Sequence, residues 1–367
     1  MFVTLQHNVD KERINSTLNA VFSDYHAAGL AEQVDYRKFY LNSLITHSTA
    51  IEGSTVTEVE NMLLFDQGIT NGKRSLYEIN MNLDLKNAYE LSESLAYSHV
   101  PFTLKMLQKL SAAVMRNTGG VHNTPLGTFD SRLGEYRLLN VTAVAGGRSY
   151  LNQPKVIPYT EKFCETMNQR RTQISKNSPL ADIYDLSFDA HYELVTIHPW
   201  VDGNGRMSRL VMNQIQEEFG VTPSKVTKEH KDEYIQSLID SRENETTEPF
   251  KRFMFSEHIN NIREEIFTHW KGLSDDFRDI KKETVEYAAK YAEGKKGFAW
   301  LRDSFNELCD SIIPKDIEDS QTAYRVKVAN CVITQCRTIM DDDKISFIRH
   351  DIEALAENPS LGKGLTR

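Results

Sequence analysis

The sequence of 367 residues is poor in the features that mark secreted and membrane proteins. It has only four cysteines and no Cys-x-x-Cys pair, which argues against a disulfide framework and against a zinc site. No run approaches the roughly 18 apolar residues of a transmembrane helix, and the N-terminus lacks the apolar segment of a secretory signal. These absences predict a cytoplasmic protein with reduced thiols and no membrane as partner.

The sequence also lacks an excess of positive charge. Its 43 Lys+Arg stand against 52 Asp+Glu, which gives a formal net charge of −9. The C-terminal segment 271–367 has 16 Lys+Arg and 18 Asp+Glu, so it has no basic excess either. A binder of the phosphate backbone would show one, and we therefore do not expect nucleic acid as a partner.

Proline and glycine are few, with 10 and 18 residues, and short apolar runs recur at three- and four-residue spacing. This pattern predicts an all-α fold. We expect helices over 10–30, 35–51, 57–64, 76–98, 103–114, 158–175, 179–197, 228–241 and 247–270, and one that starts near Asn204. The stretch 117–137 is rich in turn formers and is expected to be a loop. Residues 136–157 alone have strand character, with a short hairpin about Gly146 and Gly147.

Two signals mark the ends of the predicted N-terminal helices. Thr57 and Glu60 have the spacing of a capping box, in which each residue satisfies the other's backbone N–H. Gly53 follows Glu52 where a C-terminal cap is expected. At roughly 150 residues per domain, the length predicts two or three domains. We expect an N-terminal helical region over 1–74, a core over 75–268 and a C-terminal helical domain over 269–367.

A stretch of twelve residues, HPWVDGNGRMSR at 198–209, concentrates the chemistry of the chain. Pro199 ends the preceding helix, so His198 is expected at a helix terminus, where a histidine with a near-neutral pKa suits a general base. Gly203 and Gly205 lead into a helix whose free N–H groups can hold an anion.

Charged residues complete this segment. Arg206 and Arg209 are three apart and share one helix face at its positive end, which suits a polyphosphate. Asp202 adds a hard oxygen ligand, and Mg²⁺ is often held by one carboxylate and phosphate oxygens. Each feature alone has an ordinary structural explanation. His191 and Asp202 could also bind a metal ion together with His198, but no third His or Cys stands at ligand spacing. Together they describe nucleotidyl or phosphoryl transfer.

This segment resembles the motif of the Fic (fido) family, HPFxDGNGRxxR, with Trp200 in place of the usual phenylalanine. Both are large aromatics that can anchor the loop in the core. The segments 190–193 (AHYE) and 134–137 (GEYR) also resemble the family. The resemblance covers roughly 75–265 and implies a helical Fic core with a short β-hairpin flap.

The resemblance implies transfer of AMP from ATP to a Ser, Thr or Tyr hydroxyl of a target protein. His198 would deprotonate the hydroxyl, and Asp202 would hold Mg²⁺ against the α- and β-phosphates. The remaining contacts to the nucleotide would come from backbone N–H groups and from two arginines: Gly203, Asn204, Gly205, Arg206 and Arg209. Of these, Asn204 would take part in catalysis beside His198.

Two further assignments rest on position relative to the family. Residues 142–152 match the flap, which aligns the target segment by strand addition. Tyr234 follows Arg209 by 25 residues and matches an aromatic near the adenine. An amphipathic-helix tyrosine is also a common packing residue, so both readings of Tyr234 stay open.

A second motif concerns regulation. Residues 48–53 (STAIEG) resemble the family's inhibitory signature, (S/T)xxxE(G/N). Ser48 and Glu52 are one helical turn apart and face the same way. The resemblance implies that Glu52 pairs with Arg209 and replaces the contact to the γ-phosphate. This N-terminal position is typical of the class whose inhibitory helix precedes the core.

Three functions remain open from the sequence. The first is an autoinhibited protein adenylyltransferase, and the second is a de-AMPylase that uses the same site in reverse. The third is a nucleotide-sensing interaction protein in which 271–367 is the working module. Phosphotransfer of the Doc type is disfavoured, because Gly205 keeps the second glycine that those relatives lack. A homodimer is also left open.

Overall fold

The computed structural model describes residues 2–27, 30, 36–70, 72–142 and 150–272, and seven further positions (303, 305, 333, 352–354 and 357). Most of the expected hairpin about Gly146 and Gly147, and the helices expected after residue 272, lie outside these residues. The chain divides into two units. The larger is Lys38–His258, and the smaller combines Met1–Arg37 with Ile259–Arg367. The expected domain boundaries at 74/75 and 268/269 remain predictions.

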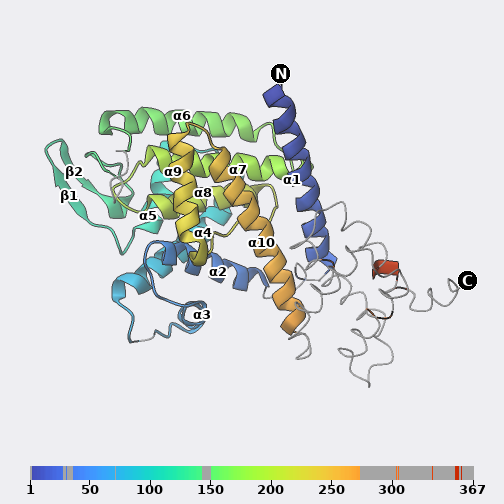
Figure 1. Cartoon of the computed structure of the whole chain (residues 1–367). Coiled ribbons are helices and arrows are strands. Elements are labelled where there is room, and N and C mark those ends of the chain that lie inside the picture. The colour runs from blue at the N-terminus through green and yellow to red at the C-terminus, as the bar shows by residue number, and fades with distance from the viewer. Residues whose placement is uncertain are drawn as a thin grey trace, which may run out of the picture. The chain divides into compact units, whose positions relative to one another are not determined.

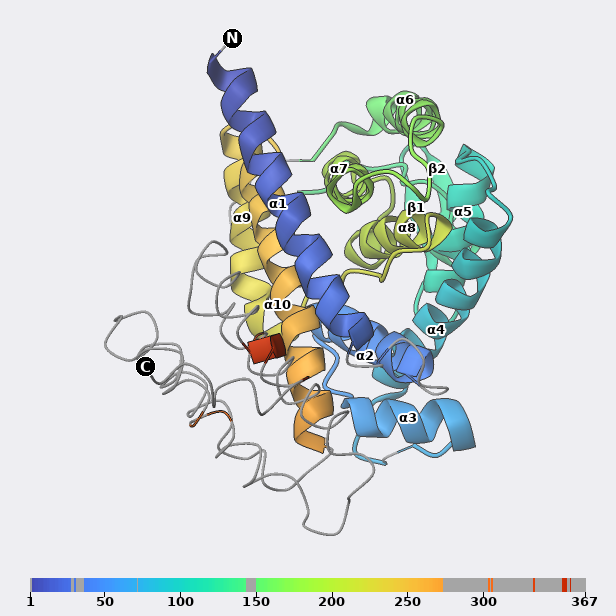
Figure 2. The same cartoon turned by 90° about the vertical axis from the view of Figure 1, so that its right-hand side faces the viewer.

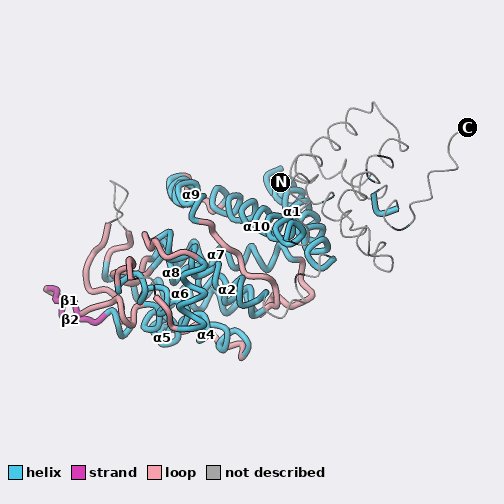
Figure 3. The backbone as a smooth tube through the Cα atoms, turned by 90° about the horizontal axis from the view of Figure 1, so that it is seen from below, coloured by secondary structure: helices cyan, strands magenta, loops and turns pink. Residues whose placement is uncertain are grey.

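The described elements are almost all helices, as Figures 1 and 3 show, and the all-α prediction is confirmed. In chain order they are α1 (Phe2–Ala27), α2 (Tyr36–Ile51), α3 (Glu58–Gln67), α4 (Leu76–Tyr97), α5 (Leu104–Val114), β1 (Val121–Thr124), β2 (Gly127–Asp130), α6 (Gln153–Arg171), α7 (Leu180–Ile197), α8 (Asn204–Glu218), α9 (Lys231–Glu243) and α10 (Glu248–Gly272). Short 3₁₀ turns occupy Ser131–Leu133 and Lys228–His230. None of the described helices combines the length and the apolar character needed to cross a membrane.

Helix α8 forms the centre of the larger unit. It packs mainly against α7 and α4, and Figure 2 shows it enclosed by its neighbours. Almost every residue of α8 is buried, including polar side chains such as Arg206, Arg209 and Asn213. Burying a charged group without partners is costly, so a central helix with arginines must either pair them or present them to a ligand.

The smaller unit is described only in part. In α1, Leu18, Val21 and Tyr25 are buried, and the Tyr25 ring lies edge-on to the ring of Tyr36. The Tyr36 hydroxyl donates a hydrogen bond of 3.4 Å to Glu265 on α10. The first residues of α2 and the distal half of α10 thus share contacts within this unit.

The prediction of a loop over 117–137 was wrong for its middle part. Residues 121–130 form a two-stranded antiparallel hairpin, in which Val121 pairs with Asp130 and Thr124 with Gly127. Figure 3 shows it at the margin of the helical core. Gly127 takes a φ of +132°, which closes the turn and which other residues rarely adopt. Only Phe129 is fully buried, so the strands lack the apolar alternation that would have predicted them.

Helix α6 begins earlier than expected, because residues 153–157 are helical rather than extended. Pro154 lies in the first turn, where its missing N–H costs no hydrogen bond and its fixed φ favours the helix. The apolar residues before Pro154 resemble a strand, and for this reason the sequence did not indicate that the helix begins at Gln153. The capping box of Thr57 and Glu60 is confirmed, with both reciprocal bonds present.

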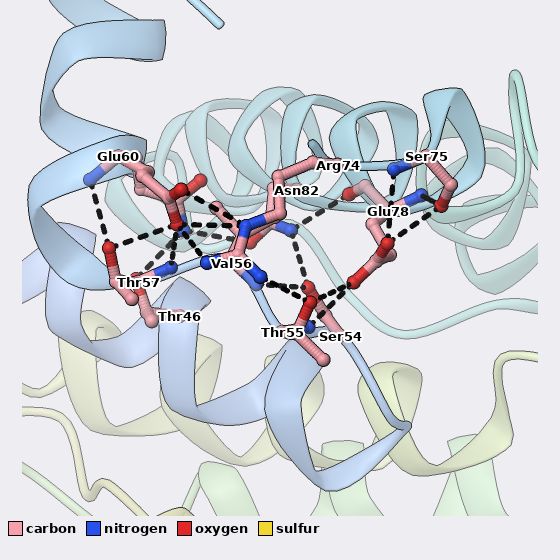
Figure 4. Close-up of polar contacts among 11 residues, drawn as sticks. Thr46, Ser54, Thr55, Val56, Thr57, Glu60, Arg74, Ser75, Glu78 and Asn82 are labelled. Atoms are coloured by element: carbon pink, nitrogen blue, oxygen red, sulfur yellow. Dashed lines mark hydrogen bonds and ion pairs between the residues drawn. The ribbon is translucent and has the colours of Figure 1, made fainter. Parts of the chain in front are cut away.

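A buried polar network fixes the turn that follows α2. The Asn82 side-chain oxygen accepts hydrogen bonds from Thr49 Oγ1 and Asn61 Nδ2, both at 2.8 Å. Its amide nitrogen donates to Ser54 Oγ at 3.1 Å and to the Glu78 carbonyl at 2.8 Å. Figure 4 shows how this network joins α2, α3, α4 and the turn between α2 and α3. The position of the C-terminal end of α2 therefore depends on α4.

We predict that Asn82→Ala lowers the free energy of unfolding by about 2–4 kcal/mol, because several buried partners lose a hydrogen bond at once. Chemical denaturation of the whole chain measures this value. Tyr89→Phe is a matched control on the same helix, since it removes one buried hydroxyl that donates to Asn213 at 2.7 Å. A loss for Asn82→Ala no larger than that for Tyr89→Phe would contradict the importance of the network.

Candidate active site

The predicted motif forms the loop between α7 and α8. Helix α7 ends at Ile197, and His198 caps it in the left-handed conformation with φ +54°. Its N–H donates to Leu194 O at 3.0 Å before Pro199 stops the helix. A non-glycine residue with positive φ is uncommon and is stabilised here by the surrounding loop. His198 thus lies at a helix terminus, as the sequence predicts.

The imidazole of His198 is held in one orientation. Nδ1 lies 3.2 Å from the carbonyl oxygen of Val195, so this nitrogen carries the proton and Nε2 keeps its lone pair. Burial lowers the pKa of His198 to about 4, and the positive charges of Arg137 and Arg242 act in the same direction. At neutral pH the ring is therefore uncharged and able to accept a proton at Nε2.

Trp200 anchors the loop in the core. Its side chain is only 1% exposed, its Nε1 donates to Gly134 O at 3.0 Å, and its ring stacks on Tyr136. Asn204 closes the loop from the other side, because its amide nitrogen donates to Trp200 O at 2.9 Å and its oxygen accepts from Trp200 N at 3.1 Å. The Asn204 side chain is therefore occupied, which leaves its backbone N–H for any contact to an anion.

Glycines are required at two positions of this loop. Gly203 caps α8 with φ +78°, and a Cβ there would lie 2.8 Å from Met115 Sδ. A Cβ on Gly205 would collide with the Glu52 carboxylate and would lie 3.1 Å from Arg209 Nη1. The N-terminus of α8 is thus open backbone, and a carboxylate already lies against it. This arrangement suits the binding of an anion.

Arg206 is a buried cation with unused donors. Its side chain is 1% exposed, and Nη2 lies 3.6 Å from Asp202 Oδ1 and 3.4 Å from Met115 Sδ. Nε and Nη1 have no hydrogen-bond acceptor among the described residues. An unsatisfied buried guanidinium is costly, and a phosphate group would supply the missing acceptors.

Arg209 is engaged by the N-terminal motif. Its Nη2 forms an ion pair of 2.6 Å with Glu52 Oε1 and donates to Ser48 O at 3.0 Å. Its Nε donates to Ser48 Oγ at 2.8 Å. Ser48 and Glu52 therefore contact the same guanidinium from one face of the end of α2, as their spacing predicts.

The Glu52 carboxylate is ionised in this contact. Burial opposes its ionisation, but the charge and hydrogen bond of Arg209, with the charge of Arg206, outweigh burial and lower the pKa of Glu52. The side chain is still 31% exposed, so water reaches part of the carboxylate. Charge-assisted hydrogen bonds of this kind are among the stronger polar contacts in proteins.

Tyr234 lies behind Arg209. It is 1% exposed, and its hydroxyl is 3.4 Å from Arg209 Nη1 and 2.8 Å from His191 Nε2. Its ring also packs against Phe250. These contacts support Arg209, and the assignment to the adenine stays a prediction. His191 bonds to Tyr234 and has its pKa well below the usual value, because it is buried and lies near Arg209.

Two residues near His198 were given no role by the sequence. Arg137 is 1% exposed and donates to the carbonyl of His198 at 2.7 Å. The Tyr150 ring stacks on the His198 ring with 3.7 Å between centroids. Arg137 belongs to the segment 134–137 that resembles the family, which was the one available signal. Tyr150 lies in the expected flap 142–152, of which residues 143–149 are outside the described part of the chain.

A magnesium ion would find one hard ligand here. Asp202 is half-exposed, and its Oδ1 accepts the Gly203 N–H at 2.6 Å. In the described part of the chain no three His, Cys, Asp or Glu side chains are grouped as a metal site. The donor set fits Mg²⁺ held by one carboxylate together with phosphate oxygens of a bound nucleotide, and Asp202 would be its protein ligand.

Comparison with known proteins agrees with this geometry. Residues 101–216 match the model of the Fic/DOC family. The chain is 26% identical over 251 residues to a protein named protein adenylyltransferase Fic of Drosophila erecta, covering 67% of this chain and 46% of that protein. The Drosophila willistoni protein of the same name is 29% identical over 253 residues, with the same coverage. The chain thus matches less than half the length of these relatives.

Solved structures share the fold. Fic-1 of C. elegans superposes with a TM-score of 0.57 at 21% identity, over 71% of this chain and 73% of that one. A Fic domain containing signaling protein of Bacteroides thetaiotaomicron gives 0.54 at 19% identity, over 67% of this chain and 94% of that one. The region of similarity includes the helices and the loop described above, so this part of the chain shares the fold of these Fic proteins and resembles the Fic/DOC family.

Proposed function

We propose that the protein is an autoinhibited adenylyltransferase, which moves AMP from ATP to a hydroxyl of a target protein. The names of its relatives support the reaction class. The single observation that carries the proposal is the loop 198–204, which places a neutral histidine next to an open helix N-terminus. Two buried arginines, Arg206 and Arg209, lie on the first turns of that helix.

His198 supplies the base for this reaction. Its Nδ1 proton is held by Val195 O, so Nε2 accepts the proton of the attacking Ser, Thr or Tyr hydroxyl. The hydroxyl oxygen forms a bond to the α-phosphorus, and the bond from that phosphorus to the β-bridging oxygen breaks. Pyrophosphate leaves, and the proton stays on His198 until solvent removes it. A pKa of about 4 keeps the ring ready for the next cycle at neutral pH.

The N-terminus of α8 holds the phosphates. Backbone N–H groups of Gly203, Asn204 and Gly205 stabilise the charge that develops on the α-phosphate. Arg209 and Arg206, whose Nε and Nη1 have no acceptor among the described residues, hold the β- and γ-phosphates. Bound Mg²⁺ at Asp202 would neutralise phosphate charge and favour departure of pyrophosphate.

Glu52 sets the activity of this site. Its carboxylate occupies Arg209 at 2.6 Å and lies against the backbone of Gly205. A γ-phosphate must replace this carboxylate to reach Arg209, and otherwise the α-phosphate is displaced from in-line attack. Ser48 supports the inhibited state, because it accepts two hydrogen bonds from the same guanidinium.

Removal of AMP from a modified protein is the second candidate reaction. The observation that favours it is the partial exposure of the ionised Glu52 carboxylate beside the α8 N-terminus. A carboxylate at this position can orient a water molecule toward a phosphorus atom. Release of AMP from a target protein that already carries it would require Glu52. Transfer of AMP to the unmodified target, in contrast, would be slowed by Glu52.

We predict that His198→Ala loses transfer by at least about a hundredfold, a typical contribution of a general base, and keeps its ATP affinity. The ring acts on the hydroxyl and not on the phosphates, so it contributes to the transition state more than to the ground state. The measurement is labelling with α-³²P-ATP alongside calorimetric ATP binding. Wild-type labelling by this variant would exclude His198 as the base.

We predict that Glu52→Gly raises self-labelling about ten- to hundredfold, since it frees a charge-assisted contact of roughly 1.5–3 kcal/mol. The gain requires Arg209, so adding Arg209→Ala returns the rate to the wild-type level or below. Initial rates of label incorporation compare the three proteins. Equal rates for wild type and Glu52→Gly would overturn autoinhibition and leave the transferase proposal standing.

We predict that Asp202→Ala abolishes the response of transfer to Mg²⁺, and that excess EDTA reproduces this loss in the Glu52→Gly protein. ATP binding with and without Mg²⁺ provides a readout separate from catalysis, because only the parent should bind ATP more tightly with the metal. Activity in EDTA equal to that in Mg²⁺ would rule out the metal role.

A further inference from the structure

Tyr150 lies against His198, the proposed general base. Tyr150 and His198 stack almost parallel, with ring centroids 3.7 Å apart and an interplanar angle of 15°. We propose that Tyr150 is a positioning residue for His198, which holds the imidazole in place and shields one of its faces from water. This inference deepens the proposed function and rests on His198 acting as the base.

The backbone around Tyr150 is fixed by a buried arginine. Arg137 donates through Nε to His198 O at 2.7 Å and through Nη1 to Leu139 O at 2.6 Å. Its Nη2 donates to the carbonyl of Leu151, the residue after Tyr150. One guanidinium thus contacts the backbone of His198, of Leu139 and of Leu151. The backbone N–H of Tyr150 also donates to Val141 O at 3.2 Å, which links the backbone of these two residues directly.

The backbone bonds and the stacking contact are independent observations that agree. Arg137 binds the backbone of both Leu151 and His198 and so holds the two segments close together. At this separation the Tyr150 ring stacks on the imidazole. On α9, the Arg242 guanidinium carbon lies 5.0 Å from the centroid of the Tyr150 ring, within the range of a cation–π contact. Tyr150 therefore contacts the active-site loop and α9 at once.

The stack has a consequence for the charge of His198. The groups that act on the ring are the cations of Arg137 and Arg242, the anion of Glu52 and the Val195 carbonyl, but burial has the largest effect. Tyr150 covers one face of the ring and so contributes to that burial. Without it, water would stabilise the imidazolium, and the pKa of His198 would rise from about 4 toward the usual 6.5.

The sign of the effect on activity follows from the role of the base. Only neutral His198 accepts a proton, so transfer falls as the pH drops through its pKa. Because burial lowers the pKa of His198, we expect this acidic limb well below neutral pH in the parent and at a higher pH once the shield is removed. A purely structural role of Tyr150 would lower activity equally at every pH.

The experiment measures kcat for self-labelling from pH 3.5 to 8 in the Glu52→Gly protein, where activity is high and where loss of the Glu52 anion keeps the pKa of His198 low. Tyr150→Ala should lower kcat at pH 7.5 through loss of ring orientation. It should also shift the acidic limb upward by about one pH unit or more, as expected for a newly solvated group. Tyr150→Phe keeps the ring and should restore both values. Tyr159→Ala, at an exposed tyrosine of α6, controls for loss of a ring elsewhere.

A second readout does not depend on activity. The ring C–H resonances of His198, assigned by their absence in His198→Gln, are titrated by NMR in the parent, Tyr150→Phe and Tyr150→Ala proteins. A raised pKa only in Tyr150→Ala supports the shielding role. An unchanged pKa together with an unmoved acidic limb overturns it. If Tyr150→Ala does not fold, Tyr150→Leu, which keeps bulk but not the flat ring, is measured instead.

The two readouts separate this inference from the proposed function. If His198→Ala still transfers AMP in the Glu52→Gly background, the role of His198 as base fails, yet the NMR titration still decides whether Tyr150 shields the ring. If His198 is essential and Tyr150→Ala leaves both the titration and the pH profile unchanged, the proposed function stands and the positioning role fails.

Discussion

The ion pair between Arg209 and Glu52 is the contact on which the rest of the site depends. It joins the central helix α8 to the end of α2 through a distance of 2.6 Å, and Ser48 and Tyr234 complete the surroundings of the guanidinium. A fully buried arginine needs a counter-charge, so the folded protein must supply either this carboxylate or a ligand phosphate. The same position thus contributes to stability and, in the proposed function, to control of activity. The Asn82 network keeps Glu52 within reach of Arg209, because it fixes the turn that carries Glu52.

The loop 198–204 illustrates a second constraint, which is that its backbone must be open while its side chains are immobile. Trp200 and Asn204 hold the loop with hydrogen bonds on both sides, and Met115 leaves no room for a side chain at Gly203. The backbone N–H groups at the start of α8 are therefore oriented before any ligand arrives. Such preorganisation lowers the reorganisation needed in the transition state.

Much of this could be predicted from the sequence, because its signals are local. The helices follow from apolar spacing, the capping box from Thr57 and Glu60, and the loop from His198 to Gly205 from glycine and proline chemistry. The β1–β2 hairpin could not be predicted, since only Phe129 is buried and no alternation marks its strands. Nor could the stack of Tyr150 on His198, because it joins residues 48 positions apart through the bonds of Arg137. The partners of Arg206 and Arg209 likewise depend on tertiary packing.

Control of the site by Glu52 is tested most directly by a pair of crystal structures with Mg²⁺ and a non-hydrolysable ATP analogue, one of the wild type and one of Glu52→Gly. We predict that Arg209 binds the γ-phosphate only in Glu52→Gly, with the α-phosphorus facing Nε2 of His198. In the wild type, Arg209 should stay on Glu52, and the triphosphate should lie in another orientation. The same nucleotide pose in both proteins, with wild-type Arg209 already on the γ-phosphate, would contradict the claim that Glu52 controls the site.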